Sequence, residues 1–246
     1  GDANRNATVR VEYRRHGDIE WQAGLKLFRV EPEGIAYGRK APPMFAGSLF
    51  DLAPGTEYEV KLTLSDPEGG GAEKLLPMRT RPVPKAPTNA LVRKVEAARL
   101  QDAFNAAAPG DILLVSEGTF EGTLDVTAKK GSVEKPIVIR AAERLKVTLD
   151  AKGAQDVVNA RGAEYIFLEG LELKGATNAA LNAEGAQGIV LRRCRIEGCK
   201  QGFYNADQRR PGRDFYIADN EIIGPYAWPK TGILSEEGVQ LCGSGH

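Results

Sequence analysis

The stretch "YIFLEGLELKG", residues 165–175, decides the fold because its apolar residues change phase in the middle. Ile166 and Leu168 alternate with other residues as the buried face of a strand does. Leu171 and Leu173 alternate in the same way, but they are one residue out of step with the first pair. A one-residue slip turns every later side chain of a straight strand to the opposite face. We therefore predict two short strands joined by a corner between the two pairs.

The same phase slip recurs twice further along the chain. "IFLEGLEL" starts at Ile166, "IVLRRCRI" at Ile189 and "FYIADNEI" at Phe215, in steps of 23 residues (166 to 189) and 26 residues (189 to 215). Self-similarity at such a period is typical of a solenoid, in which each repeat forms one coil. Its strands pair in parallel with the next coil, about 4.8 Å away. The pattern predicts an all-β chain whose later part is a parallel β-helix.

The two ends of this predicted solenoid differ. "VEAARLQDAFNAAAPGD" indicates an amphipathic helix over residues 96–108, because Val95, Leu100, Phe104 and Ala107 share one face and a Pro-Gly pair follows. An open coil exposes sheet edges and core, so we expect this helix to cap the first coil. "EGVQLCGSGH" at the other end favours a strand that opens another coil. We expect further coils beyond His246 in a longer protein, so that the β-helix here is incomplete.

The first eighty residues follow a different pattern. Alternating strands are predicted at residues 7–15, 20–30 and 57–66, separated by Pro, Gly and Asp clusters, as in a β-sandwich. "LAPGTEYEV" resembles the tyrosine-corner strand of fibronectin type III domains. The resemblance implies that the Tyr58 hydroxyl bonds back to the backbone and that Trp21 is the core tryptophan. "RPVPKAPTN" is typical of a stiff, extended linker. The expected domains are a fibronectin-like sandwich over 1–82, a linker over 83–90 and a β-helix over 91–246.

The later part also resembles a known family of enzymes. "PGDILLVSEGTFEGTLDV", "KPIVIRAA", "VTLD" and "YIFLEGLEL" follow one another in a layout similar to polysaccharide lyases of family six, the alginate lyase and chondroitinase B class. That family often stacks asparagines at the corner, where this chain has Leu171, Cys194 and Asn220. The resemblance implies a right-handed β-helix that cleaves uronate-containing polysaccharide by β-elimination. Such a reaction needs a base at C5 and a cation to neutralise the carboxylate. No catalytic residue and no cofactor is evident, and Ca²⁺ stays open.

Charge places limits on the partner. Lys+Arg and Asp+Glu both number 33, so an acidic partner requires a local cluster. One such cluster lies between Arg192 and Arg213, where seven basic residues accompany two acidic ones. Part of the cluster is explained by structural pairing. Coil stacking sets Arg192 beside Glu169, and it sets Arg195 between Glu172 and Glu221, so that charge ladders form between adjacent strands. The cluster is small and the chain neutral, which argues against nucleic acid and leaves acidic polysaccharide as the expected partner.

The remaining cations and the aromatic residues of long loops are candidates for sugar binding. The resemblance makes one sheet the wall of a cleft, and alternation turns Asn182, Tyr204 and Gln240 outward on it. The candidate substrate-binding residues are Lys200, Tyr204, Asp207, Arg209, Arg210, Tyr226, Trp228, Lys230 and Gln240. A hydrolase would instead need two carboxylates, for which Asp207 and Asp214 are the candidates. The alternative function is a non-catalytic carbohydrate-binding or adhesin-like surface protein.

The cysteines and the hydropathy suggest where the protein works. Cys194, Cys199 and Cys242 are interpreted as small buried apolar residues, with a bridge between the last two as the alternative. No apolar run approaches the roughly 20 residues that span a bilayer. We expect a secreted, periplasmic or cell-surface protein whose signal peptide has been removed.

Overall fold

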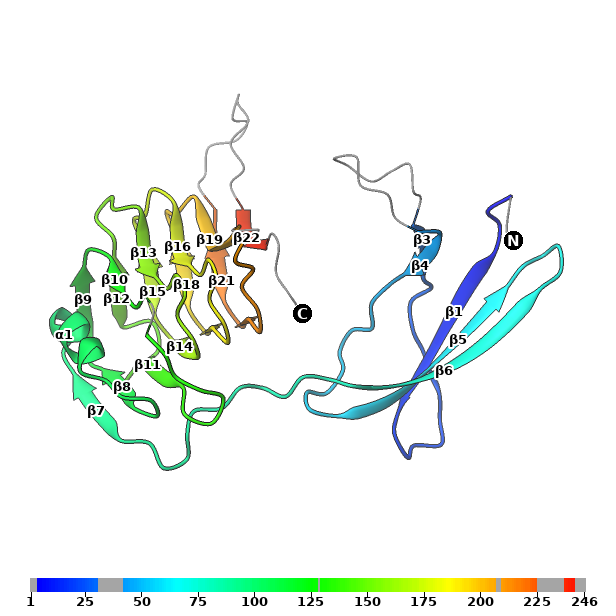
Figure 1. The fold of residues 1–246 in the computed structure, drawn as a ribbon, viewed down its shortest axis with the longest axis horizontal. Helices are drawn as coiled ribbons and strands as arrows, with labels where there is room; N and C mark the ends of the chain where they lie inside the picture. The colour runs from blue at the N-terminus through cyan, green and yellow to red at the C-terminus, as the bar shows by residue number, and fades with distance from the viewer. Residues whose placement is uncertain (1–3, 31–41, 128, 207–208, 225–236, 242–246) are drawn as a thin grey trace, which may run out of the picture. The chain divides into compact units, whose positions relative to one another are not determined.

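A computed structural model describes residues 4–30, 42–127, 129–206, 209–224 and 237–241 (Figure 1). The chain divides into two compact units, Gly1–Val83 and Pro84–His246, which are described separately. Within the described residues, no helix is long and apolar enough to cross a membrane.

The first unit contains two antiparallel sheets. A four-stranded sheet has the order β2-β1-β5-β6, and a separate two-stranded sheet pairs β3 with β4. The strands are β1 (Thr8–Arg15), β2 (Gln22–Ala23), β3 (Phe28–Val30), β4 (Met44–Ala46), β5 (Glu57–Ser65) and β6 (Gly71–Arg79). The predicted strands at 7–15 and 57–66 are confirmed, whereas β6 was not predicted.

The single strand predicted over 20–30 is wrong, because the chain forms two shorter strands there. The Gly24 amide donates to the Val11 carbonyl at 2.9 Å, and the Leu27 amide donates to the Val9 carbonyl at 3.2 Å. Three residues of this segment thus oppose two of β1, which interrupts the ladder as a bulge does.

Two aromatic residues test the resemblance of this unit to fibronectin type III domains. The buried Tyr58 hydroxyl accepts a hydrogen bond from the Ala53 amide at 2.9 Å, as the resemblance implies. Trp21 is not a core residue, however. It is partly exposed, and its ring lies against the Arg14 guanidinium at 4.4 Å and the Lys61 ammonium at 4.6 Å. The fibronectin topology is therefore not confirmed.

The second unit is a parallel β-solenoid in which each coil adds one strand to each of three sheets (Figure 1). Coils 1 to 5 begin at β8, β11, β14, β17 and β20. Sheet one contains β7 (Val92–Val95), β8 (Ile112–Val115), β11 (Ile137–Ala141), β14 (Ile166–Glu169), β17 (Val190–Arg192) and β20 (Tyr216–Ala218). Sheet two contains β9 (Gly118–Glu121), β12 (Val147–Asp150), β15 (Glu172–Lys174), β18 (Arg195–Glu197) and β21 (Glu221–Ile223). Sheet three contains β10 (Leu124–Asp125), β13 (Asp156–Asn159), β16 (Ala179–Asn182), β19 (Gln201–Asn205) and β22 (Glu237–Leu241).

The corner predicted from the phase slip is confirmed. Gly170, Arg193 and Asp219 occupy it in successive coils, with φ of 72°, 56° and 57°. A left-handed residue redirects the chain between sheet one and sheet two. The alternation of buried residues therefore shifts by one position at the corner, from Leu168 to Leu171. The Gly170 amide donates to the Arg192 carbonyl at 3.1 Å, and so stacks one corner on the next. An L-residue in this conformation costs about 1–2 kcal/mol, which the stacking offsets.

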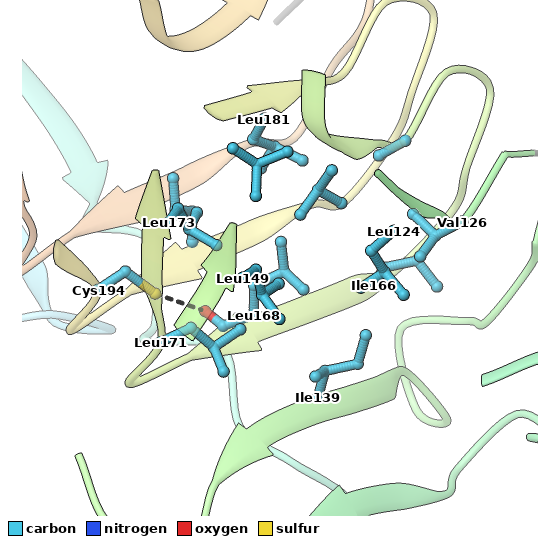
Figure 2. Close-up of a cluster of buried hydrophobic side chains, with 14 of the residues drawn as sticks. Leu124, Val126, Ile139, Leu149, Ile166, Leu168, Leu171, Leu173, Leu181 and Cys194 are labelled. Atoms are coloured by element: carbon cyan, nitrogen blue, oxygen red, sulfur yellow. Dashed lines mark hydrogen bonds between the residues drawn. The ribbon is translucent and has the colours of Figure 1, made fainter. Parts of the chain in front are cut away.

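The interior of the solenoid is filled by apolar side chains from both sides of the corner. Leu168, Leu171 and Leu173 are fully buried and point into the same cluster as Ile139 and Leu149 (Figure 2). The registers Leu168↔Leu191 and Leu173↔Ile196 place equivalent residues of successive coils on top of one another, as predicted.

The helix before coil 1 is shorter than predicted. A 3₁₀ turn over Ala97–Arg99 leads into α1 (Leu100–Asn105), in place of one helix over 96–108. Leu100 and Phe104 are the buried residues of α1, as predicted. Val95 and Ala107 are also buried in the solenoid core, but Val95 ends β7 and Ala107 follows the helix, so the predicted four-residue helical face is only partly correct. The helix lies beside β9 and β10 at the coil-1 end (Figure 1). Its role as a cap stays a prediction.

The cysteine interpretation holds for the two cysteines that the structure describes. Cys194 and Cys199 are buried free thiols, and Cys242 lies outside the described residues. The Cys194 thiol is 3.3 Å from the Arg192 carbonyl and packs in the core.

Burial predicts how these thiols react. It raises the pKa of Cys194 from 9.0 to about 12, and it also raises the pKa of Cys199. In a Cys242→Ser background we expect negligible reaction with Ellman's reagent at pH 8 until the chain is unfolded, because the thiolate is the nucleophile.

The protonated Cys194 thiol is favoured in the folded state, so its contribution to stability is complete below about pH 9 and is lost as pH rises toward 12. The melting temperature should fall more between pH 8 and 10.5 than it does in a Cys194→Ala variant. Equal falls would contradict the assignment.

Candidate functional site

The outer face of sheet one is covered by the segment that links the two units. Four apolar side chains on this face are buried and pack against Ala86 and Ala90 of that segment: Ile112, Val138, Phe167 and Val190. A polymer would have to displace the chain to reach them.

The outer face of sheet two carries charges that neutralise one another. The Lys152 ammonium lies 3.0 Å from a Glu121 carboxylate oxygen and 3.5 Å from one of Asp150. The hydrogen bond to Glu121 and the nearby carboxylates raise the pKa of Lys152, so this amine stays protonated and is unsuited to act as a base. Arg195 is paired with Glu197 at 3.4 Å and with Glu221 at 3.9 Å.

One of the two predicted charge ladders is confirmed, and the other is confirmed only between Arg195 and Glu221. The Arg192 guanidinium lies 2.8 Å from the Glu169 carboxylate in the neighbouring coil. Glu172 and Arg195 are paired in register, but the Glu172 carboxylate accepts from the Thr148 hydroxyl at 2.7 Å, on the other side. Register brings two backbones together, whereas the rotamers decide which neighbour each side chain meets.

Sheet three carries a row of polar residues at the ends of its strands. The register aligns Asp125, Asn159, Asn182, Tyr204 and Gln240 across the coils. The side chains of the first three each accept the amide two residues later, at 2.9, 3.4 and 3.3 Å. These are Asx turns, which end each strand in the same way.

Asn182 is not available to a ligand, although it was predicted to face outward. It is fully buried, and its amide donates to the Asp156 carboxylate at 3.1 Å. Asp156 is itself buried and also accepts from Asn178 at 2.8 Å. A buried carboxylate requires donors, and the Asn182 amide supplies one of them.

The turn that follows sheet three brings further charged residues together. The Arg161 guanidinium lies 3.0 Å from Glu184 in the next coil. The longer loop of coil 4 folds back over this turn, since a Cβ placed on Gly185 would lie 3.4 Å from the Cβ of Arg210. Arg209 and Arg210 are exposed there. We call Tyr204, Arg209 and Arg210, with the Arg161–Glu184 pair, the sheet-three edge.

The structure separates the predicted site residues into two groups. Tyr204 is partly exposed near the end of β19 that leads to Arg209 and Arg210, whereas Lys200 immediately precedes the start of β19. The length of this strand, roughly 16 Å at about 3.3 Å per residue, separates Lys200 from the others. Of Gln240 only the backbone register is described. Asp207, Tyr226, Trp228 and Lys230 lie outside the described residues.

Several residues of the edge were missed by the sequence interpretation. Arg161 and Glu184 occupy the third position of "NARG" at 159–162 and "NAEG" at 182–185. The recurrence of Asn-Ala-x-Gly at the 23-residue step was a readable signal for a repeated turn. Asp214 accepts from the Gln187 amide at 3.2 Å, and its proposed carboxylate partner Asp207 is not described.

Metal binding gains no assigned ligand. Among the residues that the structure describes, no group of three or more His, Cys, Asp or Glu side chains could hold a metal ion. The Ca²⁺ that the resemblance leaves open therefore has no described site.

Comparisons with known proteins show low similarity. No protein-family model and no curated protein matches the chain. A mutant of the PL6 family alginate lyase AlyGC is 20% identical, with 55% of this chain and 19% of that chain covered and a TM-score of 0.41. A family 28 exopolygalacturonase of Yersinia enterocolitica is 10% identical, with 70% and 49% covered and a TM-score of 0.32. The catalytic domain of a GH87 alpha-1,3-glucanase is 11% identical, with 88% and 56% covered and a TM-score of 0.19.

The chain spans between 19% and 56% of the length of these three structures. At such identities and TM-scores the likeness carries no argument about chemistry. The assignment of a parallel solenoid rests on the strand pairing described above.

Proposed function

We propose that this chain is part of a carbohydrate-active β-helix protein that binds a uronate-containing polysaccharide along sheet three. The observation that carries the proposal is the position of Arg209 and Arg210, which are exposed beside the row of polar residues at the ends of the sheet-three strands. Tyr204, in the same row, is partly exposed. On sheet one, by comparison, the linker packs against the apolar residues of the outer face.

The chemistry of the sheet-three edge suits an acidic sugar polymer. A tyrosine ring such as that of Tyr204 offers an apolar face to sugar C–H groups and a hydroxyl to their oxygens. The planar guanidinium groups of Arg209 and Arg210 match the geometry of a carboxylate. Exposed cations also draw an anionic polymer toward the surface, with a strength that falls as salt rises.

We further propose that the complete protein cleaves its polymer by β-elimination on a right-handed helix of the family-six type. The same proposal includes secretion of the protein and an N-terminal module of fibronectin type III type. It also includes a capping role for α1 and a requirement for Ca²⁺. The second candidate is binding without cleavage.

Removal of two arginines tests the binding face. An Arg209→Gln/Arg210→Gln chain should bind alginate or pectate oligosaccharides about 10- to 100-fold more weakly, because each charge-assisted hydrogen bond contributes about 1.5–3 kcal/mol before screening. Isothermal titration calorimetry at low and at physiological salt measures the change. The matched control is Lys94→Gln/Arg99→Gln, which removes two exposed cations from the coil-1 end. Equal affinities of the two variants would contradict binding at sheet three.

Absorbance near 235 nm separates cleavage from binding, since β-elimination leaves a conjugated double bond. The full-length protein incubated with alginate, pectate or a glycosaminoglycan should show a rise with one of them. Binding without a rise would support the second candidate. If the protein neither binds nor cleaves any of the three polymers, the proposal is overturned.

A further inference from the structure

The outer face of sheet one carries an apolar stripe that crosses the coils. It consists of Ile112, Val138, Phe167 and Val190, one residue from each of coils 1 to 4, with 7%, 0%, 5% and 2% of each residue exposed. These side chains form a cluster separate from the solenoid interior. Three partly buried residues pack against it, namely Tyr216 of coil 5 and, from outside the coils, Ala86 and Ala90.

The part of this cover that comes from outside the coils is the proline-rich segment 84–90, here called the strap. Its Ala86 and Ala90 pack against the stripe. At one end the Pro84 carbonyl accepts a hydrogen bond from Arg192 of coil 4 at 3.4 Å. At the other end the strap leads into β7, which pairs with β8 of coil 1. The strap therefore runs across the coils, from the fourth back to the first.

The coil-4 end of the strap is held by a buried ion pair. The Glu169 side chain is only 6% exposed and lies between Arg140 at 2.6 Å and Arg192 at 2.8 Å. Glu169 fixes the guanidinium of Arg192, and this guanidinium in turn reaches the Pro84 carbonyl. The ladder thus contributes to the docking of the strap as well as to the joining of coils 2, 3 and 4.

The length of the strap fits this path. Three coil-to-coil steps of about 4.8 Å require about 14 Å. Seven fully extended residues would reach about 22 Å at about 3.1 Å per residue, and the turn at Thr88 and Asn89 shortens this span. The strap can cross the stripe without strain, and its prolines favour the extended form before it docks.

We propose that the outer face of sheet one is a docking surface for this chain's own residues 84–90, and that the strap makes coils 1 to 4 unfold as one unit. In a solenoid each coil contacts only its neighbours, so the coils at the ends open independently. The strap contacts coils 1 and 4 together, and its loss should uncouple them.

Charged substitutions in the strap test this role. In the full chain, Ala86→Asp/Ala90→Asp places two carboxylates against the stripe. Thr88→Asp/Asn89→Asp places the same charges at exposed strap positions and is the matched control. We expect at least a tenfold faster hydrogen exchange of amides in β8 and β17 in the first variant alone. Cleavage within the strap by proteinase K, which does not require Lys85, should also accelerate at least tenfold, because an undocked strap enters the protease site.

A second variant keeps the test decisive if the first folds poorly. Arg192→Lys retains a cation beside Glu169. The lysine ammonium is a single compact group without the branched guanidinium, so it cannot bind Glu169 and the Pro84 carbonyl at the same time. The variant should speed cleavage within the strap severalfold while the circular dichroism stays unchanged. Cleavage and exchange rates that match those of the control in both variants would overturn the proposal. Sugar binding at sheet three is not needed for either outcome.

Discussion

Replacement of Glu169 by glutamine should lower the free energy of unfolding of the solenoid by about 3–5 kcal/mol, one of the two largest effects we expect from any single change. The Glu169 carboxylate is buried and accepts from Arg140 and Arg192 at 2.6 and 2.8 Å. The neutral amide would leave two guanidinium groups facing each other without a negative charge. Arg140 is 35% exposed, so solvent would relieve part of the cost and the lower half of the range applies.

Urea denaturation followed by circular dichroism measures this loss. The matched control is Glu172→Gln, just after the same corner, where the carboxylate is partly exposed and accepts from the Thr148 hydroxyl. A single partly exposed hydrogen bond contributes about 1 kcal/mol, so the control should be much milder. Similar losses in the two variants would show that the ladder of Arg140, Glu169 and Arg192 is not a principal tie between coils.

Truncation of Phe203 to alanine is the second large change, with an expected loss of about 3–5 kcal/mol. Phe203 is fully buried in the core of coil 4, and its ring meets Phe215 of the next coil at 4.9 Å between centroids, edge to face. The substitution removes the transfer free energy of a phenyl ring, leaves a cavity and breaks an aromatic pair that contributes about 1 kcal/mol. Since Tyr204 follows directly in β19, sugar binding should weaken in the same variant.

Thermal melts and urea titrations of Phe203→Ala and Phe203→Leu check this prediction. Leucine retains most of the buried apolar volume, so it should recover at least half of the loss. Phe50→Ala, at a residue 63% exposed in the first unit, should change stability by less than about 0.5 kcal/mol. A loss of stability in Phe203→Ala as small as that in Phe50→Ala would contradict the packing of Phe203 in the core of coil 4.

The repeat was readable from the sequence because it is a local pattern. Inward residues of a strand recur every second position. At each corner this alternation shifts by one position. Leu168, Leu191 and Ile217 could therefore be aligned from letters alone, and the structure pairs these residues in register. The apolar face of α1 was readable for the same reason, because a helix has its own fixed period.

The errors concern side chains whose neighbours come from elsewhere in the chain. Asn182 has the alternation of an outward residue, yet it is buried because Asp156 of the preceding coil takes its amide. Glu172 turns to Thr148 and not to Arg195 because two neighbouring coils compete for one carboxylate. Trp21 lies between two cations and not in a core.

The candidate site was only partly predictable. Arg209 and Arg210 were singled out from charge and loop length, and Tyr204 from strand alternation. The structure places all three towards one end of β19. Lys200 was grouped with them because it is close in sequence, but it precedes the opposite end of that strand. Arg161 and Glu184 belong to the edge and were missed, although the recurring Asn-Ala-x-Gly marks their turns.

By itself the sequence determined the coils, because each coil is specified by short-range alternation and by left-handed corners such as Gly170. Only the tertiary structure decided which outer face is open. The sequence of the stripe residues on sheet one does not reveal whether their side chains are exposed or covered. Residues 84–90 pack against them, although most of the stripe residues are distant from this segment in the chain. Burial depends on which distant segments meet, and a one-dimensional pattern does not contain that information.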